Sequence, residues 1–277
     1  MSPVSLAIER ISQWVGAEDA DQSLATFRRV FAGVWLLYDA IDLVWGTTER
    51  SLSWFPHARD WRLAALQVVL VASGLMLVVG KRIWMFGMAA AAARATEALE
   101  MFPLNDFYFC SIVYALIAHS GGGPFAEGRR PKWVHDALLV EFAWVYLATG
   151  VLKLNRDWLS GGHLFVRTQY LVQSQDWPFP LPVERALRSL PIDGVLATVG
   201  AALEILLSGV MFARRPYRLG VTLAVAIHGA GALITNVWFF SASMIAGVAL
   251  LLPRTHRAKS LTDSRLRPPP RAASDDG

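Results

Sequence analysis

Several ionisable residues of this sequence stand inside stretches that are otherwise apolar. Asp39 and Asp42 lie three residues apart in the stretch AGVWLLYDAIDLVW, and Glu204 and His228 each lie midway along another apolar stretch. If such a stretch crosses a membrane as a helix, a charged residue at its centre costs roughly 2.5–3.5 kcal/mol, whereas a leucine or isoleucine returns about 0.3–0.6 kcal/mol. Residues retained at that cost face the interior of a helix bundle and mark functional sites. We therefore predict that these four side chains point inward and take part in function.

Two further groups of polar residues accompany them. Arg94, Glu97 and Glu100 share one face of the apolar stretch that begins at Ile83, because a spacing of three returns to the same side of a helix. The second group closes another apolar stretch and consists of Lys153, Asn155, Asp157 and Trp158. We predict that the two groups and the four residues above surround one polar cavity that opens to the outer side of the membrane.

Some of these residues also have a structural interpretation. Arg94 and Glu97 stand three apart, as a neutralising ion pair on one helix would. His228 would join two helices through a single hydrogen bond. Lys153 would anchor a helix end by extending its amine toward the headgroups, as lysines near helix ends commonly do. For these residues, the residue types and spacings leave both interpretations open.

The composition predicts the kind of fold that must position these residues. Of the 277 residues, 54% are hydrophobic and 17% are charged, whereas a soluble domain averages about 25% charged residues. We predict an all-α integral membrane protein with the lipid bilayer as its main partner. The basic residues form small clusters between apolar stretches, so nucleic acid is not an expected partner. The single cysteine, Cys110, excludes an intramolecular disulfide and a cysteine-based metal cluster, and no metal site is expected.

A membrane span needs about 20 mostly apolar residues, and the sequence contains about eight such stretches. The expected transmembrane helices are Phe27–Trp45, Trp61–Val79, Ile83–Met101, Asp106–His119, Asp136–Leu154, Gly194–Ala213, Leu219–Asn236 and Val237–Leu252. The last two follow each other directly, so we expect a tight turn between them.

The basic clusters predict the orientation of these spans. The basic runs KR, RRPK and RRPYR begin at Lys81, Arg129 and Arg214. Two, four and six of the expected spans precede them, so all three runs fall on the same side of the membrane as the N-terminus. Because lysine and arginine favour cytoplasmic loops, both termini are expected in the cytoplasm and the protein in the cell membrane, the inner membrane if it is bacterial. Residues 1–26 are expected to form an interfacial amphipathic segment, and residues 254–277 a disordered basic tail. The long extracytoplasmic segment, residues 155–193, is expected to hold interfacial helices.

The run AWVYLATGVLKLNRDWLSGGHL, residues 143–164, resembles the signature of the vitamin K-dependent gamma-carboxylase family. The wider group is the horizontally transferred transmembrane (HTTM) domain proteins. In that family a span ending in Tyr-x-x-Ala/Thr-Gly runs into Lys-Leu-Asp/Asn-x-Asp-Trp and then Gly. Those places are taken here by Tyr146, Gly150, Lys153, Leu154, Asn155, Asp157, Trp158 and Gly161.

The resemblance extends beyond this run. Glu204 in one span, His228 in the next and the Phe239–Met244 stretch also match the family, and Phe27–Asp39 resembles its first span. Together these matches define an expected HTTM-like transmembrane domain over residues 27–253.

The resemblance implies quinol chemistry. In the carboxylase, the lysine at the position of Lys153 is thought to deprotonate vitamin K hydroquinone, and the resulting anion reacts with oxygen to give an epoxide. A lysine acts in this way only as the neutral amine, a form that removal from water favours. The resemblance therefore assigns Lys153 as the base and a reduced quinone, such as menaquinol or vitamin K hydroquinone, as the lipid-soluble partner. Glu204 and His228 would act in support. The remaining intramembrane polar residues would complete the site: Asp39, Asp42, Arg94, Glu97, Asn155, Asp157 and Trp158.

The sequence also departs from the carboxylase. The carboxylase has two lysines in this run, and Leu152 stands at the place of the first. It also has a large lumenal portion that binds the propeptide of its protein substrates, whereas only residues 254–277 follow the last expected span here. The resemblance therefore does not extend to peptide carboxylation.

Two other functions remain open at this stage. One is a non-enzymatic partner in the maturation or export of a secreted peptide, as proposed for some HTTM proteins linked to secreted toxins. The other is a small proton-coupled transporter, because paired intramembrane carboxylates also suit proton coupling.

Overall fold

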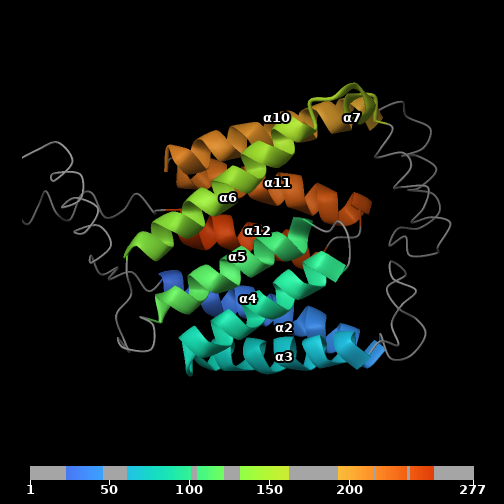
Figure 1. Cartoon of the computed structure of the whole chain (residues 1–277). Helices are drawn as coiled ribbons and strands as arrows, with labels where there is room; N and C mark the ends of the chain where they lie inside the picture. The colour runs from blue at the N-terminus through green and yellow to red at the C-terminus, as the bar shows by residue number, and fades with distance from the viewer. Residues whose placement is uncertain are drawn as a thin grey trace, which may run out of the picture.

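The part of the chain that the structure describes is entirely helical. The computed structural model describes residues 23–45, 61–100, 105–121, 132–161, 193–214, 216–235 and 238–252. The helices in these ranges are α2 (Ser23–Trp45), α3 (Trp61–Val79), α4 (Ile83–Glu100), α5 (Asn105–Ser120), α6 (Lys132–Leu152), α7 (Arg156–Leu159), α10 (Asp193–Phe212), α11 (Tyr217–Thr235) and α12 (Trp238–Leu251). All but α7 are long, and Figure 1 shows these long helices lying side by side in one bundle.

Each of the eight expected spans coincides with a long helix, so the predicted all-α architecture is confirmed. By length and hydropathy, two helical segments among the described residues can cross a membrane, Lys132–Leu152 and Gly194–Phe212. Three apolar helical segments are shorter: Ala64–Val79, Phe107–Ser120 and Phe239–Leu251. The number of spans and their direction therefore remain predictions.

The helix ends differ in places from the expected ones. Helix α2 begins at Ser23 because Leu24 and Phe27 are both buried and extend its apolar face. Helix α6 ends at Leu152, so Lys153 lies in the turn that follows, where its N–H still donates to the Thr149 carbonyl at 3.1 Å. Most of the expected N-terminal segment, most of the segment 155–193 and the expected C-terminal tail lie outside the described residues.

A tight turn joins α3 to α4. Between α3 and α4, the Gly80 N–H donates to the Met76 carbonyl at 2.9 Å, and Gly80 has φ +83°, a conformation that glycine adopts without strain. The Arg28 side chain lies against Gly80, and its Nε donates to the Leu77 carbonyl at 3.1 Å. Arg28 thus satisfies a carbonyl at the end of α3 and joins α2 to it.

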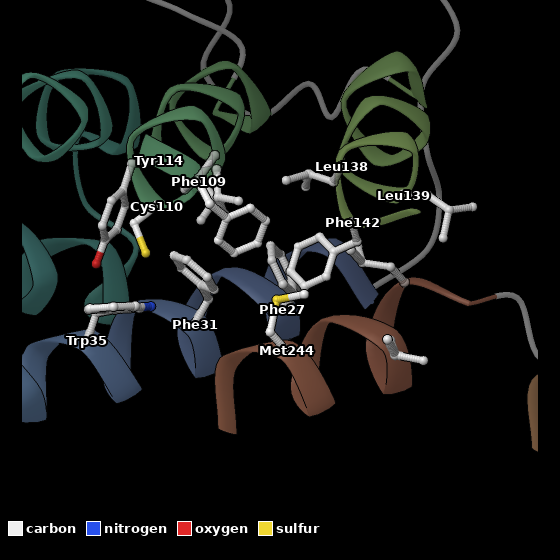
Figure 2. Packing of buried hydrophobic residues seen from close by; sticks show 14 of the residues in the cluster. Phe27, Phe31, Trp35, Phe109, Cys110, Tyr114, Leu138, Leu139, Phe142 and Met244 are labelled. Atoms are coloured by element: carbon white, nitrogen blue, oxygen red, sulfur yellow. The ribbon is translucent and has the colours of Figure 1, made fainter. Parts of the chain in front are cut away.

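An aromatic core holds the centre of the bundle together. Phe27 and Phe31 of α2 meet Phe109 of α5 and Phe142 of α6, as Figure 2 shows, and the ring centroids of Phe109 and Phe142 are 5.0 Å apart in an edge-on arrangement. Such edge-to-face pairs stabilise packing beyond the area they bury. Helix α12 reaches this core closely, because a Cβ on Gly247 would overlap the Phe142 ring.

The distribution of side chains suits a lipid environment. Arg94, Asp39 and Glu97 are almost completely buried. Large apolar side chains are exposed on the outside of the bundle, among them Leu99 at 72% and Leu152 at 70%. Large apolar side chains exposed to the surroundings, together with ion pairs buried in the bundle, form an arrangement that lipid favours.

Candidate functional site

The close approach of α6 and α10 brings Lys153 to Glu204. A Cβ on Gly150 would lie 2.7 Å from Ile205 Cγ1 and 3.2 Å from the Ala201 carbonyl oxygen, so only glycine fits there without a shift. Lys153 Nζ forms an ion pair and hydrogen bond with Glu204 Oε1 across this contact. The Lys153 side chain is 24% exposed and that of Glu204 is 10% exposed, so the pair lies at the edge of the packed interior.

The short helix α7 covers the Lys153 amine with an aromatic ring. The Asn155 side chain caps α7, because its Oδ1 accepts from the Trp158 N–H at 2.9 Å. Its Nδ2 donates to the Leu152 carbonyl at 2.7 Å and so ties α7 to the end of α6. The cap holds the Trp158 ring with its centroid 5.0 Å from Lys153 Nζ, a cation–π distance.

Asp157 is not the carboxylate that Lys153 contacts. It lies in the first turn of α7 and is exposed, and Glu204 is the carboxylate that Lys153 contacts. The Asn155 cap thus fixes the Trp158 ring beside the Lys153 amine. The run from Lys153 to Gly161 is a capped turn, which ends with Gly161 at φ +83°.

A second pair lies beside the first. The Tyr146 hydroxyl of α6 and His228 Nε2 of α11 form a hydrogen bond of 2.8 Å, and both residues are buried. Tyr146 precedes Lys153 by seven residues, or about two turns of α6, so the two pairs follow each other along this helix. We call Lys153, Glu204, Tyr146, His228 and Trp158 the Lys153 site. His228 therefore does join two helices through a hydrogen bond.

One buried carboxylate oxygen in the Lys153 site lacks a hydrogen-bond partner among the described residues. Glu204 Oε1 contacts Lys153, whereas Oε2 is buried and has no hydrogen-bond partner among the described residues. A buried acceptor left unpaired is costly, so a bound donor such as a hydroxyl would stabilise it.

The other polar residues form a separate group in α2, α3 and α4. Arg94 Nη2 contacts Asp39 Oδ1 at 2.5 Å, and Nη1 contacts Glu97 Oε2 at 2.6 Å. Gln67 Nε2 donates to Glu97 Oε1 at 3.0 Å. We call these four residues the Arg94 cluster. The expected ion pair between Arg94 and Glu97 is therefore present. Further contacts of these two residues with Asp39 and Gln67 link α2, α3 and α4.

Aromatic rings surround the Arg94 cluster and lie between it and the Lys153 site. The guanidinium carbon of Arg94 is 4.7 Å from the centre of the Trp35 ring and 5.8 Å from that of Tyr38. Tyr38 in turn contacts Phe239, whose neighbour Phe240 packs against His228 with ring centroids 6.0 Å apart. Among the described side chains the polar residues therefore form two clusters, and a shared polar cavity that includes Asp42 and Glu100 stays a prediction.

Some residues are placed only in part, and others were not expected. Asp42 belongs to α2 and Glu100 to α4, but their side chains lie outside the described residues. Tyr146 belongs to the quoted run, yet neither the residue type nor the spacing indicated a hydrogen bond to His228. Within the described ranges, no three His, Cys, Asp or Glu side chains gather in a way that could hold a metal ion.

Comparisons with known proteins give one match, to a family model. Searches among curated proteins and among solved structures give no match. Residues 125–255 match the family model of the HTTM domain, a range that contains the whole Lys153 site. The match confirms the suspected HTTM resemblance over these residues, and it suggests a membrane protein.

Proposed function

We propose that this protein is a multi-pass membrane enzyme that oxidises a membrane quinol to its epoxide, with Lys153 as the base. The observation that carries this proposal is the position of the lysine amine. Nζ contacts the Glu204 carboxylate and lies 5.0 Å from the centre of the Trp158 ring, at the end of α6. The amine therefore has a carboxylate as proton acceptor on one side and the face of an aromatic ring on another.

The residues of the Lys153 site supply a path for the proton. The Lys153 ammonium first passes a proton to Glu204 Oε1, which leaves the neutral amine. The amine then takes the proton of a quinol hydroxyl, so the O–H bond breaks and an N–H bond forms. The hydrogen-bonded Tyr146–His228 pair, about two helical turns before Lys153 along α6, completes the proposed path. The buried Glu204 Oε2 accepts a hydrogen bond from the substrate.

Molecular oxygen is the oxidant in the proposed reaction. The quinol anion reacts with oxygen, one oxygen atom enters the ring as the epoxide, and the other leaves as water. Quinol plus oxygen thus gives quinone epoxide plus water, and no further reductant is needed.

The test of this function compares two variants of Lys153. Lys153→Arg keeps the positive charge and the reach of an anchor, but a guanidinium does not deprotonate in a protein. Lys153→Ala removes both. We expect both variants to insert and fold, and both to lose quinol epoxidation by at least about a hundredfold, as expected for removal of a general base.

The assay uses detergent-solubilised protein with a menaquinol-type substrate under oxygen, and it follows epoxide formation. Turnover by Lys153→Arg at the wild-type rate would show that Lys153 is only an anchor. A wild-type protein that purifies without quinone and turns over no quinol would favour a non-enzymatic role beside a secreted peptide.

A further inference from the structure

The turn between α3 and α4 gathers three basic side chains at one end of the bundle. Lys81 and Arg82 follow Gly80 directly, and both are exposed. The guanidinium of Arg28, from α2, lies against Gly80, and its Nε donates to the Leu77 carbonyl at 3.1 Å. Arg28 is only 6% exposed, so packing holds this cation in a fixed place beside the two exposed ones. We call Arg28, Lys81 and Arg82 the basic turn.

The helix ends around the basic turn carry no acidic residue in the part of the chain that the structure describes. Residues 23–32 of α2 and residues 70–92 of α3, the turn and α4 contain no Asp or Glu. The end of α5 lies here too, because a Cβ on Gly121 would contact Ile83, and residues 111–121 also lack acidic side chains. The positive charge of the basic turn therefore favours an anionic partner.

Large apolar side chains are exposed within about two helical turns of the basic turn. Leu75 and Val79 share one face of α3, and each is 54% exposed. Met85 and Met88 are exposed on the first turns of α4. Trp84 is exposed as well, as are the tryptophans that lie at headgroup level in membrane proteins. Cations that border an apolar wall match a lipid, because a lipid joins a polar headgroup to apolar chains.

The backbone of Arg82 is unusual for its residue type. Arg82 has φ +47°, in the left-handed region that glycine favours, and its carbonyl accepts from the Phe86 N–H at 3.1 Å as α4 begins. Gly80 adopts φ +83° two residues earlier without strain. The chain thus has arginine at a position where the backbone favours glycine, and this supports a role for the guanidinium outside the bundle.

We propose that the basic turn binds the headgroup of an anionic phospholipid, whose acyl chains lie along the exposed apolar side chains of α3 and α4. Arginine and lysine both donate to phosphate oxygens, and Arg28 is already held in place before the lipid binds. Basic pockets between membrane helices bind such headgroups on the cytoplasmic side, the side predicted for this turn. Figure 1 shows the α3–α4 turn and α7 at opposite ends of the bundle, so the lipid would leave the Lys153 site free.

The experiment titrates phosphatidylglycerol or phosphatidylcholine into the detergent-solubilised full chain and follows bound lipid by native mass spectrometry. Wild type is expected to bind phosphatidylglycerol at least about tenfold more tightly than phosphatidylcholine. Lys81→Gln and Arg82→Gln should each weaken phosphatidylglycerol binding about fivefold, the factor expected for one cation near a headgroup. Arg218→Gln is the matched control, because it removes an exposed cation of α11 outside the basic turn, and it should bind as wild type does.

Arg82→Gly separates lipid binding from folding. In phosphatidylcholine its unfolding temperature should be at least that of wild type, because glycine accepts the left-handed backbone, yet it should bind phosphatidylglycerol about fivefold more weakly. Wild-type affinity in Arg82→Gly overturns the proposal, as does equal binding of the two lipids by wild type. Equal weakening by Lys81→Gln and Arg218→Gln would show a diffuse attraction in place of a site. Displacement of the lipid by inorganic phosphate would show that the turn binds a free anion, which also overturns the proposal.

Discussion

Tyr146 offers a test, at the scale of one residue, of whether protons leave the Lys153–Glu204 pair through a defined path. Its hydroxyl is hydrogen-bonded to His228 Nε2 at 2.8 Å, and Tyr146→Phe removes this hydroxyl while keeping the ring in the core. We expect quinol turnover to fall by about a hundredfold, as when a proton-transfer group is removed. The solvent isotope effect on turnover should change as well, which a purely structural role of the hydroxyl would not cause.

A matched tyrosine serves as the control for this substitution. Tyr108 lies on α5 and is 41% exposed, so Tyr108→Phe removes a hydroxyl outside the site. It is expected to leave both rate and isotope effect unchanged. If Tyr146→Phe turns over quinol as fast as Tyr108→Phe does, the proton does not travel through Tyr146.

At the scale of helices, the contact of α6 with α10 determines whether Lys153 reaches Glu204. Gly150→Ala places a methyl group against Ile205, so it should move the two helices apart and cost about 1–3 kcal/mol of stability. We expect it to lower quinol turnover as well. Thermal unfolding in detergent and the epoxidation assay measure the two effects.

Gly209→Ala is the control for that helix contact. A Cβ on Gly209 meets no atom within 4 Å, and alanine favours helix over glycine by about 1 kcal/mol. This variant should be slightly more stable than wild type and fully active. The reverse order of the two variants in stability would contradict the close packing of α6 and α10.

The Arg94 cluster is expected to matter for the stability of α2, α3 and α4 and not for the chemistry. Arg94→Leu leaves the carboxylates of Asp39 and Glu97 buried without their shared cation, which should cost about 3–5 kcal/mol. Arg29→Leu, at an exposed position of α2, should change stability by less than about 0.5 kcal/mol. Chemical denaturation in mixed micelles measures both, and similar stabilities for the two variants would show that the cluster is not a structural link.

The helices could be predicted from the sequence, but their partners could not. The ends of α3 and α4 follow from apolar stretches bounded by charged or turn-forming residues, such as Gly80 and Lys81. Lys153 and Glu204 are 51 residues apart, and their pairing depends on which helices lie together and on the approach at Gly150.

At the scale of the whole molecule, the orientation of the bundle is a prediction that labelling can test. Single cysteines at Ser53 and Ser174, in a Cys110-free background, should react with a membrane-impermeant thiol reagent added outside the cell. A cysteine at Ser264 should not react, because the basic clusters favour the cytoplasm for the loops and tail on that side. Reaction at Ser264 with silence at Ser53 would invert the bundle and place Lys153 on the cytoplasmic side.

The burial of Arg94 beside Asp39 has a consequence for the order of events during synthesis. The two residues are 55 positions apart, so at about 5–20 residues per second α2 precedes its cation by roughly 3–11 s. During that interval Asp39 lacks the Arg94 guanidinium that it contacts in the folded bundle. Helices α2, α3 and α4 are therefore expected to leave the insertion machinery as one unit, and chains truncated before Arg94 should remain associated with that machinery in a ribosome-bound cross-linking experiment.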